Sequence, residues 1–131
     1  MTILIGYVPT PVGEAALDAG LAEAATRGED VVILNSPRRG ATVDAHLVDD
    51  AAVASLVARA EELGVKARVD HADHGSDVVD TFEELVRETG ARLIVIGLRR
   101  RSPVGKLVMG SSAQRILLEA SVPVLAVKPT A

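Results

Sequence analysis

One stretch decides the fold of this chain: Leu93-Ile-Val-Ile-Gly97-Leu-Arg-Arg-Arg-Ser-Pro-Val-Gly105-Lys-Leu-Val-Met-Gly110-Ser111-Ser112. A short aliphatic run, typical of a buried strand, leads through glycines, hydroxyl groups and cationic side chains into a segment with helical spacing. Such junctions hold phosphates in α/β proteins, because glycine lets the backbone approach an anion and the free amides of a helix N-terminus carry about half a positive charge. The stretch therefore predicts an α/β fold that binds a nucleotide or another phosphate.

Five apolar runs punctuate the chain, and segments with helical spacing lie between them. The runs are rich in Val, Ile and Leu and mostly continuous, as expected of strands buried on both faces of a parallel sheet. We expect strands at residues 2–8, 30–35, 65–70, 92–96 and 122–127 and helices at residues 14–27, 46–63, 78–89 and 112–120. Gly28, Gly64 and Gly90 follow helical segments, where a left-handed residue ends a helix. The alternation indicates one doubly wound domain over residues 1–131.

The composition limits the function. Of the 131 residues, 48% are hydrophobic but only 2% are aromatic, and the formal net charge is −4. An acidic chain with few aromatic rings is a poor partner for nucleic acids, so we expect none to bind. The chain has no cysteine, which excludes disulfides and thiolate chemistry. No apolar run reaches the roughly 20 residues of a membrane helix, and the N-terminus does not resemble a signal peptide, so we expect a cytoplasmic protein without membrane contact.

Four motifs, together with the order of the elements, resemble the universal stress protein family. They are Ile3-Leu-Ile-Gly6, Arg92-Leu-Ile-Val-Ile-Gly97, Gly110-Ser111 and Ser121-Val-Pro-Val-Leu-Ala-Val-Lys128. The resemblance covers essentially the whole chain. It implies an open, Rossmann-like α/β fold, with a five-stranded parallel sheet of order 3-2-1-4-5 and two helices on each face. It also implies a role in the stress response.

Nucleotide-binding members of that family resemble one another in a fingerprint of Gly, two residues, Gly, nine residues, Gly and a hydroxyl residue. Gly97 matches the first glycine, Gly110 the last and Ser111 the hydroxyl residue, whereas Arg100 stands at the middle glycine. Arginine discourages the positive φ angles and close backbone approach that glycine allows. Arg100 and its two arginine neighbours nevertheless add positive charge that can grip a phosphate.

A second departure from the family pattern lies at the end of the first strand. Nucleotide-binding relatives place an aspartate there, near adenine and ribose, and the matching residue here is Val8. The resemblance implies ATP at the carboxyl ends of the first and fourth strands, with Mg²⁺ accompanying the phosphates. The expected binding residues are Pro9 and Thr10 near the base and Gly97, Arg101, Ser102, Val104, Gly105, Gly110, Ser111 and Ser112 around the phosphates.

Residues 122–127, Val122-Pro-Val-Leu-Ala-Val127, should form an edge strand, because they are the last apolar run. An exposed apolar edge invites aggregation unless another strand pairs with it. Members of the resembled family commonly dimerise through their last strands. Both arguments predict a homodimer that forms through this strand. We also expect protein partners, which the sequence does not identify.

Other interpretations stay open for several features. Ser111 and Ser112 are also typical helix N-caps, and the glycines and arginines suit tight turns on a solvated surface. His71 and His74 share a predicted loop with two aspartates, a pattern more typical of solvated residues than of a metal site. No nucleophile elbow or Lys-containing P-loop occurs, so no catalytic residue is expected, although slow ATP hydrolysis stays possible. The alternative function is a nucleotide-free module that binds other proteins.

Overall fold

The computed structural model describes residues 1–35, 49–71, 78–98 and 111–129, and strands and helices alternate along them. The elements are β1 (Thr2–Tyr7), α1 (Pro11–Arg27), β2 (Asp30–Asn35), α2 (Asp50–Glu62), β3 (Ala67–His71), α3 (Val78–Thr89), β4 (Leu93–Gly97), α4 (Ser111–Glu119) and β5 (Val124–Val127). All five expected strands and four expected helices are therefore present, with shifts at their ends.

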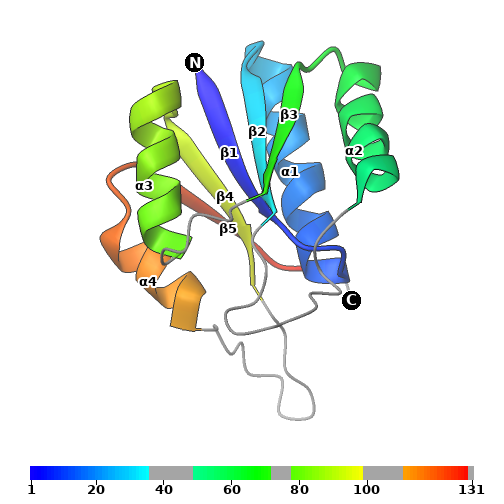
Figure 1. The fold of residues 1–131 in the computed structure, drawn as a ribbon. Helices are drawn as coiled ribbons and strands as arrows, with labels where there is room; N and C mark the ends of the chain where they lie inside the picture. Colours follow the sequence, from blue (N-terminus) through cyan, green and yellow to red (C-terminus); the bar gives the residue numbers. More distant parts are fainter. Residues whose placement is uncertain (36–48, 72–77, 99–110, 130–131) are drawn as a thin grey trace.

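The five strands form one parallel sheet of order β3-β2-β1-β4-β5 (Figure 1). In the middle of the sheet, Ile3 of β1 pairs with Val31 of β2 on one side and with Leu93 of β4 on the other. The strand order reverses at β1, because β2 and β3 lie on one side of it and β4 and β5 on the other. The predicted sheet topology is confirmed, and it creates a crevice between β1 and β4 at the carboxyl ends of the strands.

The helices α1 and α2 cover one face of the sheet, and α3 and α4 cover the other (Figure 1). One core cluster joins α1 and α2 to residues such as Ile3, Ile5 and Ile33, and the other joins α3 and α4 to Leu4, Leu34 and similar residues. The residues alternate between the two clusters along each central strand, as the pleat requires. Both faces of these strands are therefore buried, which explains why the sequence runs are continuously apolar.

Helix ends follow local signals in the backbone. Gly28, Gly64 and Gly90 have φ angles of 65°, 73° and 69°, so the predicted left-handed conformation after the first three helices is confirmed. The first helix starts at Pro11 rather than at Glu14, because the Thr10 side chain accepts a hydrogen bond from the Gly13 amide and Pro occupies the first turn. Apolar periodicity alone does not reveal such a start.

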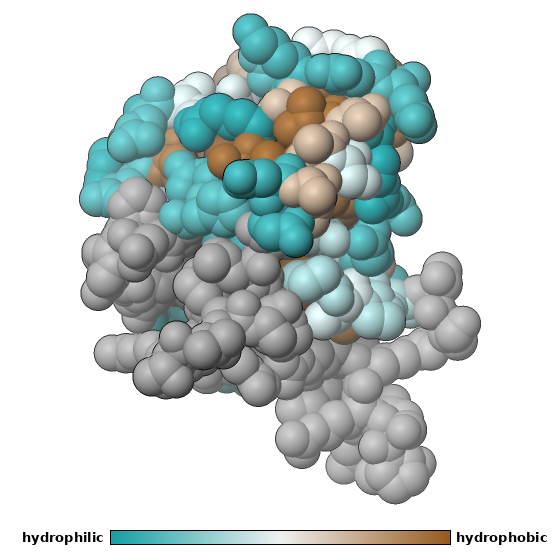
Figure 2. Space-filling view, turned by 45° about the vertical axis from the view of Figure 1, so that its right-hand side comes forward, coloured by the Kyte–Doolittle hydropathy of each residue, from teal (hydrophilic) through white to brown (hydrophobic). Residues whose placement is uncertain are grey.

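The second helix also begins at a cap. Asp49 is its N-cap residue, and its Oδ1 atom accepts a hydrogen bond from the Ala52 amide at 2.8 Å. The helix therefore starts at Asp50, later than the predicted residue 46, which lies outside the described residues. Figure 2, turned toward the side of α2 and β3, shows a mostly hydrophilic described surface with hydrophobic residues between teal ones in its upper part.

The strand β5 forms one edge of the sheet and pairs only with β4 among the described strands. The turn that leads into it is held by α3. Glu83 accepts two hydrogen bonds from Ser121, one from the backbone amide at 2.9 Å and one from the hydroxyl at 2.7 Å. The Leu125 side chain on β5 is 40% exposed, so part of the edge is apolar and open to solvent.

Candidate functional site

A pocket of about 210 Å³ opens at the carboxyl ends of β1 and β4. Its described walls come from six elements, β1, α1, β2, α3, β4 and α4, and from the turn after β1. They are Gly6, Tyr7, Val8, Val12, Gly13, Leu34, Phe82, Ile96, Gly97, Ala113 and Ile116. The pocket lies at the crevice where the strand order reverses, between the first turns of α1 and α4, the position at which open α/β sheets bind ligands.

The pocket has a buried floor and a half-exposed rim. Leu34, Phe82, Ile96 and Ile116 belong to the core cluster under α3 and α4, and none of their side chains is more than 6% exposed. At the rim, Val8, Val12 and Ala113 are only partly buried. The floor is therefore a continuation of the hydrophobic core, and a flat apolar group is the kind of ligand part that it suits.

Two glycines let the backbone close this crevice. A Cβ atom on Gly97 would overlap the carbonyl oxygen of Val12, and one on Gly13 would overlap the carbonyl of Val8. Glycine is needed at both positions because backbone groups approach each other there. Gly97, predicted as a binding residue, thus lines the pocket and also allows α1 to sit against the end of β4.

A chain of polar contacts holds the first turn of α1 on the face of the sheet that α1 and α2 cover. The Tyr7 hydroxyl donates to Oε1 of Glu14 at 2.7 Å, and Arg59 of α2 donates to Oε2 of Glu14 and to Oδ1 of Asp18, both at 2.7 Å. Burial, and then the Glu14 hydrogen bond and charge, raise the pKa of Tyr7 to about 12. The Tyr7 hydroxyl is therefore a bound donor and stays protonated at neutral pH.

The charge at the two helix N-termini differs. Burial alone would raise the pKa of Glu14, but hydrogen bonds from Tyr7 and Arg59 and the Arg59 charge outweigh burial and hold the pKa below its usual value. Glu14 is thus a carboxylate in the first turn of α1, whereas the first turn of α4 has no acidic residue. Of the two helix ends, α4 offers the better environment for an anion.

The predicted binding residues fall into two groups. Gly97 lines the pocket, Pro9 and Thr10 form the turn beside its rim, and Ser111 and Ser112 begin α4. Thr10 also caps α1. The remaining predicted residues lie outside the described residues, as does Arg100; they are Arg101, Ser102, Val104, Gly105 and Gly110.

Sequence reasoning missed the apolar walls of the pocket. Leu34, Phe82, Ile96 and Ile116 read as core residues, since their spacing matches the buried faces of strands and helices. Apolar spacing is the same for residues of a closed core and for residues of a pocket floor, so it does not distinguish them. The nearest signal was topological: a pocket at the switch point has to be lined by the residues that end β1, β2 and β4.

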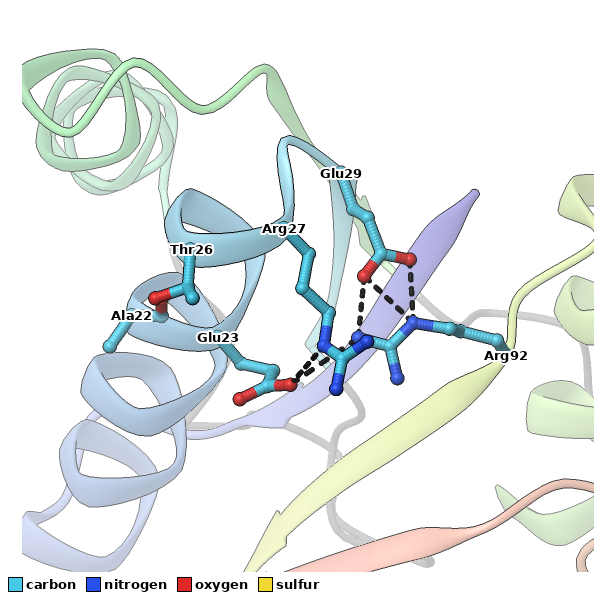
Figure 3. A network of polar contacts seen from close by, with 6 residues as sticks. All are labelled: Ala22, Glu23, Thr26, Arg27, Glu29 and Arg92. Carbon is cyan, nitrogen blue, oxygen red and sulfur yellow. Dashed lines mark hydrogen bonds and ion pairs between the residues drawn. The ribbon is translucent and has the colours of Figure 1, made fainter.

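The opposite end of the sheet is closed by ion pairs. Figure 3 shows Arg92, just before β4, reaching Glu29 before β2 and Glu23 near the end of α1. The Nε atom of Arg92 donates to both Glu29 carboxylate oxygens at 2.7 Å, and Nε of Arg27 donates to Glu23 at 2.7 Å. The Arg92 hydrogen bond holds the pKa of Glu29 below its usual value, although burial opposes it. These charges neutralise one another and stabilise the chain.

Other candidate sites are weaker. Within the described residues, no group of three or more His, Asp or Glu side chains is arranged to hold a metal ion. His71 ends β3 and is exposed, while the predicted neighbour His74 lies outside the described residues. Among the described helices, none is long and apolar enough to cross a membrane.

Comparison with known proteins agrees with this architecture. The sequence model of the universal stress protein family matches residues 1–128. This chain belongs to the universal stress protein family. A universal stress protein of Mycolicibacterium smegmatis is 39% identical over 127 residues, covering 97% of each chain. The resemblance seen in the sequence motifs is thereby confirmed.

Solved universal stress proteins share the fold. One from Archaeoglobus fulgidus is 30% identical, with 98% of both chains covered and a TM-score of 0.80. A universal stress protein from the same organism, in complex with dAMP, is 25% identical, again with 98% of both chains covered, and has a TM-score of 0.75. The likeness therefore extends over nearly the whole length of this universal stress protein.

Proposed function

We propose that this universal stress protein is a cytoplasmic homodimer that binds an adenine nucleotide, ATP, and signals or protects under stress according to the occupancy of the site. The observation that carries the proposal is the pocket between β1 and β4, which opens between two helix N-termini at the switch point of the sheet. The dAMP bound by the relative from Archaeoglobus fulgidus supports a nucleotide as the ligand.

The charge difference between the two helices orients the ligand. The base enters the apolar floor, and the phosphates lie against the first turn of α4, which has no acidic residue. Glu14 in the first turn of α1 disfavours an anion at that helix. Ser111 and Ser112 at the start of α4 then contact the phosphates, together with Gly110 and the arginines before it, and Mg²⁺ accompanies the phosphates.

Thermal unfolding with and without MgATP tests nucleotide binding. A ligand at 100 times its dissociation constant stabilises the folded state by about 2.7 kcal/mol, which raises Tm by several degrees in a domain of this size. An unchanged Tm at millimolar MgATP would instead favour the nucleotide-free module that binds other proteins.

A matched pair of substitutions at Ala113 separates binding from stability. Ala113 lines the rim of the pocket within the first turn of α4. Ala113→Glu puts a negative charge where phosphates are expected. The charge should not destabilise the helix itself, because acidic side chains near a helix N-terminus interact favourably with the helix dipole. We expect the MgATP shift to disappear in Ala113→Glu while the free protein unfolds no earlier. Ala113→Gln, of equal size and no charge, should keep most of the shift; equal shifts in both variants would place the phosphates elsewhere.

The proposed dimer forms through the open edge of β5. Val124, Ala126 and Val127 are half-buried and Leu125 is 40% exposed, so a second β5 strand would both bury apolar surface and pair the edge backbone groups. Leu125→Lys should give a monomer by light scattering. Leu63→Lys, at a 52% exposed leucine beyond the end of α2, is the control and should leave the mass unchanged. A dimer that survives Leu125→Lys would exclude this interface.

A further inference from the structure

The side chains at the rim of the pocket at the end of β1 are hydrocarbon. Val8 and Val12 lie there, half-buried, and the backbone of Gly13 packs closely against Val8 and that of Gly97 against Val12. Ala113 in the first turn of α4 lines the same pocket, so a ligand that spans the pocket from the floor to that turn can lie against the two valines. In a nucleotide, the part between base and phosphates is the sugar.

Among the residues that the structure describes, the polar side chains next to this rim make hydrogen bonds within the protein. The Tyr7 hydroxyl donates to Glu14 at 2.7 Å, and Tyr7 packs in the core cluster of the opposite face, under α1 and α2. The Thr10 hydroxyl accepts from the Gly13 amide at 3.3 Å, and the Val8 carbonyl accepts from the Thr10 amide at 2.7 Å. These bonds hold the turn between β1 and α1, and Thr10 is not among the residues that line the pocket.

We infer that the site accepts 2′-deoxyribonucleotides about as well as ribonucleotides, because the sugar lies against the apolar rim formed by Val8 and Val12. The inference rests on the proposed nucleotide function. A site that hydrogen-bonds a substrate hydroxyl strongly rejects the analogue that lacks it, since its own polar group is left unpaired, whereas an apolar wall discriminates weakly. Affinity then comes from the base in the floor and the phosphates at α4.

Calorimetric titration with MgATP and with MgdATP tests the inference in the unmodified protein. We expect dissociation constants within about three-fold of each other, a difference at the lower end of what one neutral hydrogen bond contributes. Binding of MgATP with MgdATP more than about ten-fold weaker would overturn the inference and leave the proposed function intact. No heat with either nucleotide would overturn both.

Val8→Asp provides the complementary test. Val8 follows the last residue of β1 and is half-buried, so a carboxylate there can reach water. Because it repels the phosphates of both nucleotides equally, the ratio of the two dissociation constants reports on the sugar alone. We expect that ratio to change to about a ten-fold preference for MgATP. Leu63→Asp, with the same added charge at an exposed leucine beyond the end of α2, should keep the original ratio. An unchanged ratio in Val8→Asp would overturn the placement of the sugar at this rim.

Discussion

The two ends of the sheet differ in chemistry. At the amino ends of the strands, Arg92, Glu29, Glu23 and Arg27 form ion pairs that close the layers on one another. At the carboxyl ends, the layers part around an apolar pocket, and glycines replace side chains. One end therefore contributes stability through satisfied charges, while the other keeps two helix N-termini and a hydrophobic floor accessible to a ligand.

The largest expected effect tests the close backbone packing at the pocket end. Gly13→Ala should destabilise the protein by about 3 kcal/mol, because the new Cβ would overlap the Val8 carbonyl and overpacking outweighs the better helix propensity of alanine. Gly20→Ala is the matched control within the same helix. Its Cβ would meet the end of the Ile5 side chain, which can move, so about 1 kcal/mol is expected. Urea unfolding measures both, and equal losses would contradict the argument.

A second test concerns the ion pairs at the two ends. Arg92→Met should cost about 1 to 2 kcal/mol, because it leaves the buried Glu29 carboxylate without its partner. Arg59→Met at the pocket end should cost less than about 1 kcal/mol, since Arg59, Glu14 and Asp18 are all more than a third exposed. The Arg92 variant should keep the full MgATP-induced shift in Tm. If Arg59→Met destabilised the protein more than Arg92→Met, the ion pairs at the pocket end would be the more stabilising ones, contrary to this expectation.

Acid should weaken the same ion pairs. The pKa values of Glu29 and Glu14 lie below their usual value of 4.5 in the folded state. Their contribution to stability is therefore present above about pH 4.5 and is lost as the pH falls through the lowered folded values. Glu29→Gln should flatten the loss of stability as the pH falls below about 4.5, measured by urea unfolding, and Glu14→Gln should flatten it less. Parallel curves for Glu29→Gln and the unmodified protein would contradict this account.

The smallest expected effects concern the helix caps. The Thr10 hydroxyl accepts a long hydrogen bond of 3.3 Å, whereas the Asp49 carboxylate accepts one of 2.8 Å. Thr10→Ala should therefore cost about 0.5 kcal/mol and Asp49→Ala about 1 kcal/mol in urea unfolding. If Thr10→Ala also weakened MgATP binding by more than its loss of stability explains, Thr10 would contact the ligand as well as cap α1.

Much of the fold was predictable from the sequence. Continuous aliphatic runs such as Asp30–Asn35 and the strongly periodic α3 (Val78–Thr89) have the predicted bounds, because burial on both faces or on one stripe dominates their composition. The starts of α1 and α2 were misplaced. Their first turns are specified by Thr10-Pro11 and by Asp49, which are capping signals rather than apolar ones.

The position of the candidate site was predictable from the sequence, but the residues of its apolar floor were not. The switch point and Gly97 follow from the strand order and the glycine pattern. The floor residues could not be predicted in this way. Phe82 and Ile116 come from helices far apart in the sequence, and their spacing is the same as that of other buried residues. Only the packing of α3 and α4 against the strand ends reveals that these side chains border empty space. Arg99, Arg100, Arg101 and Gly110, which the sequence places around the phosphates, lie outside the described residues.

The helix α3 serves two places at once. Phe82 is part of the pocket floor, and the next residue, Glu83, holds Ser121 at the entry to β5. Successive side chains of one helix thus border the ligand pocket and anchor the edge strand. A substitution that displaced α3 would therefore alter both the pocket floor and the entry to β5.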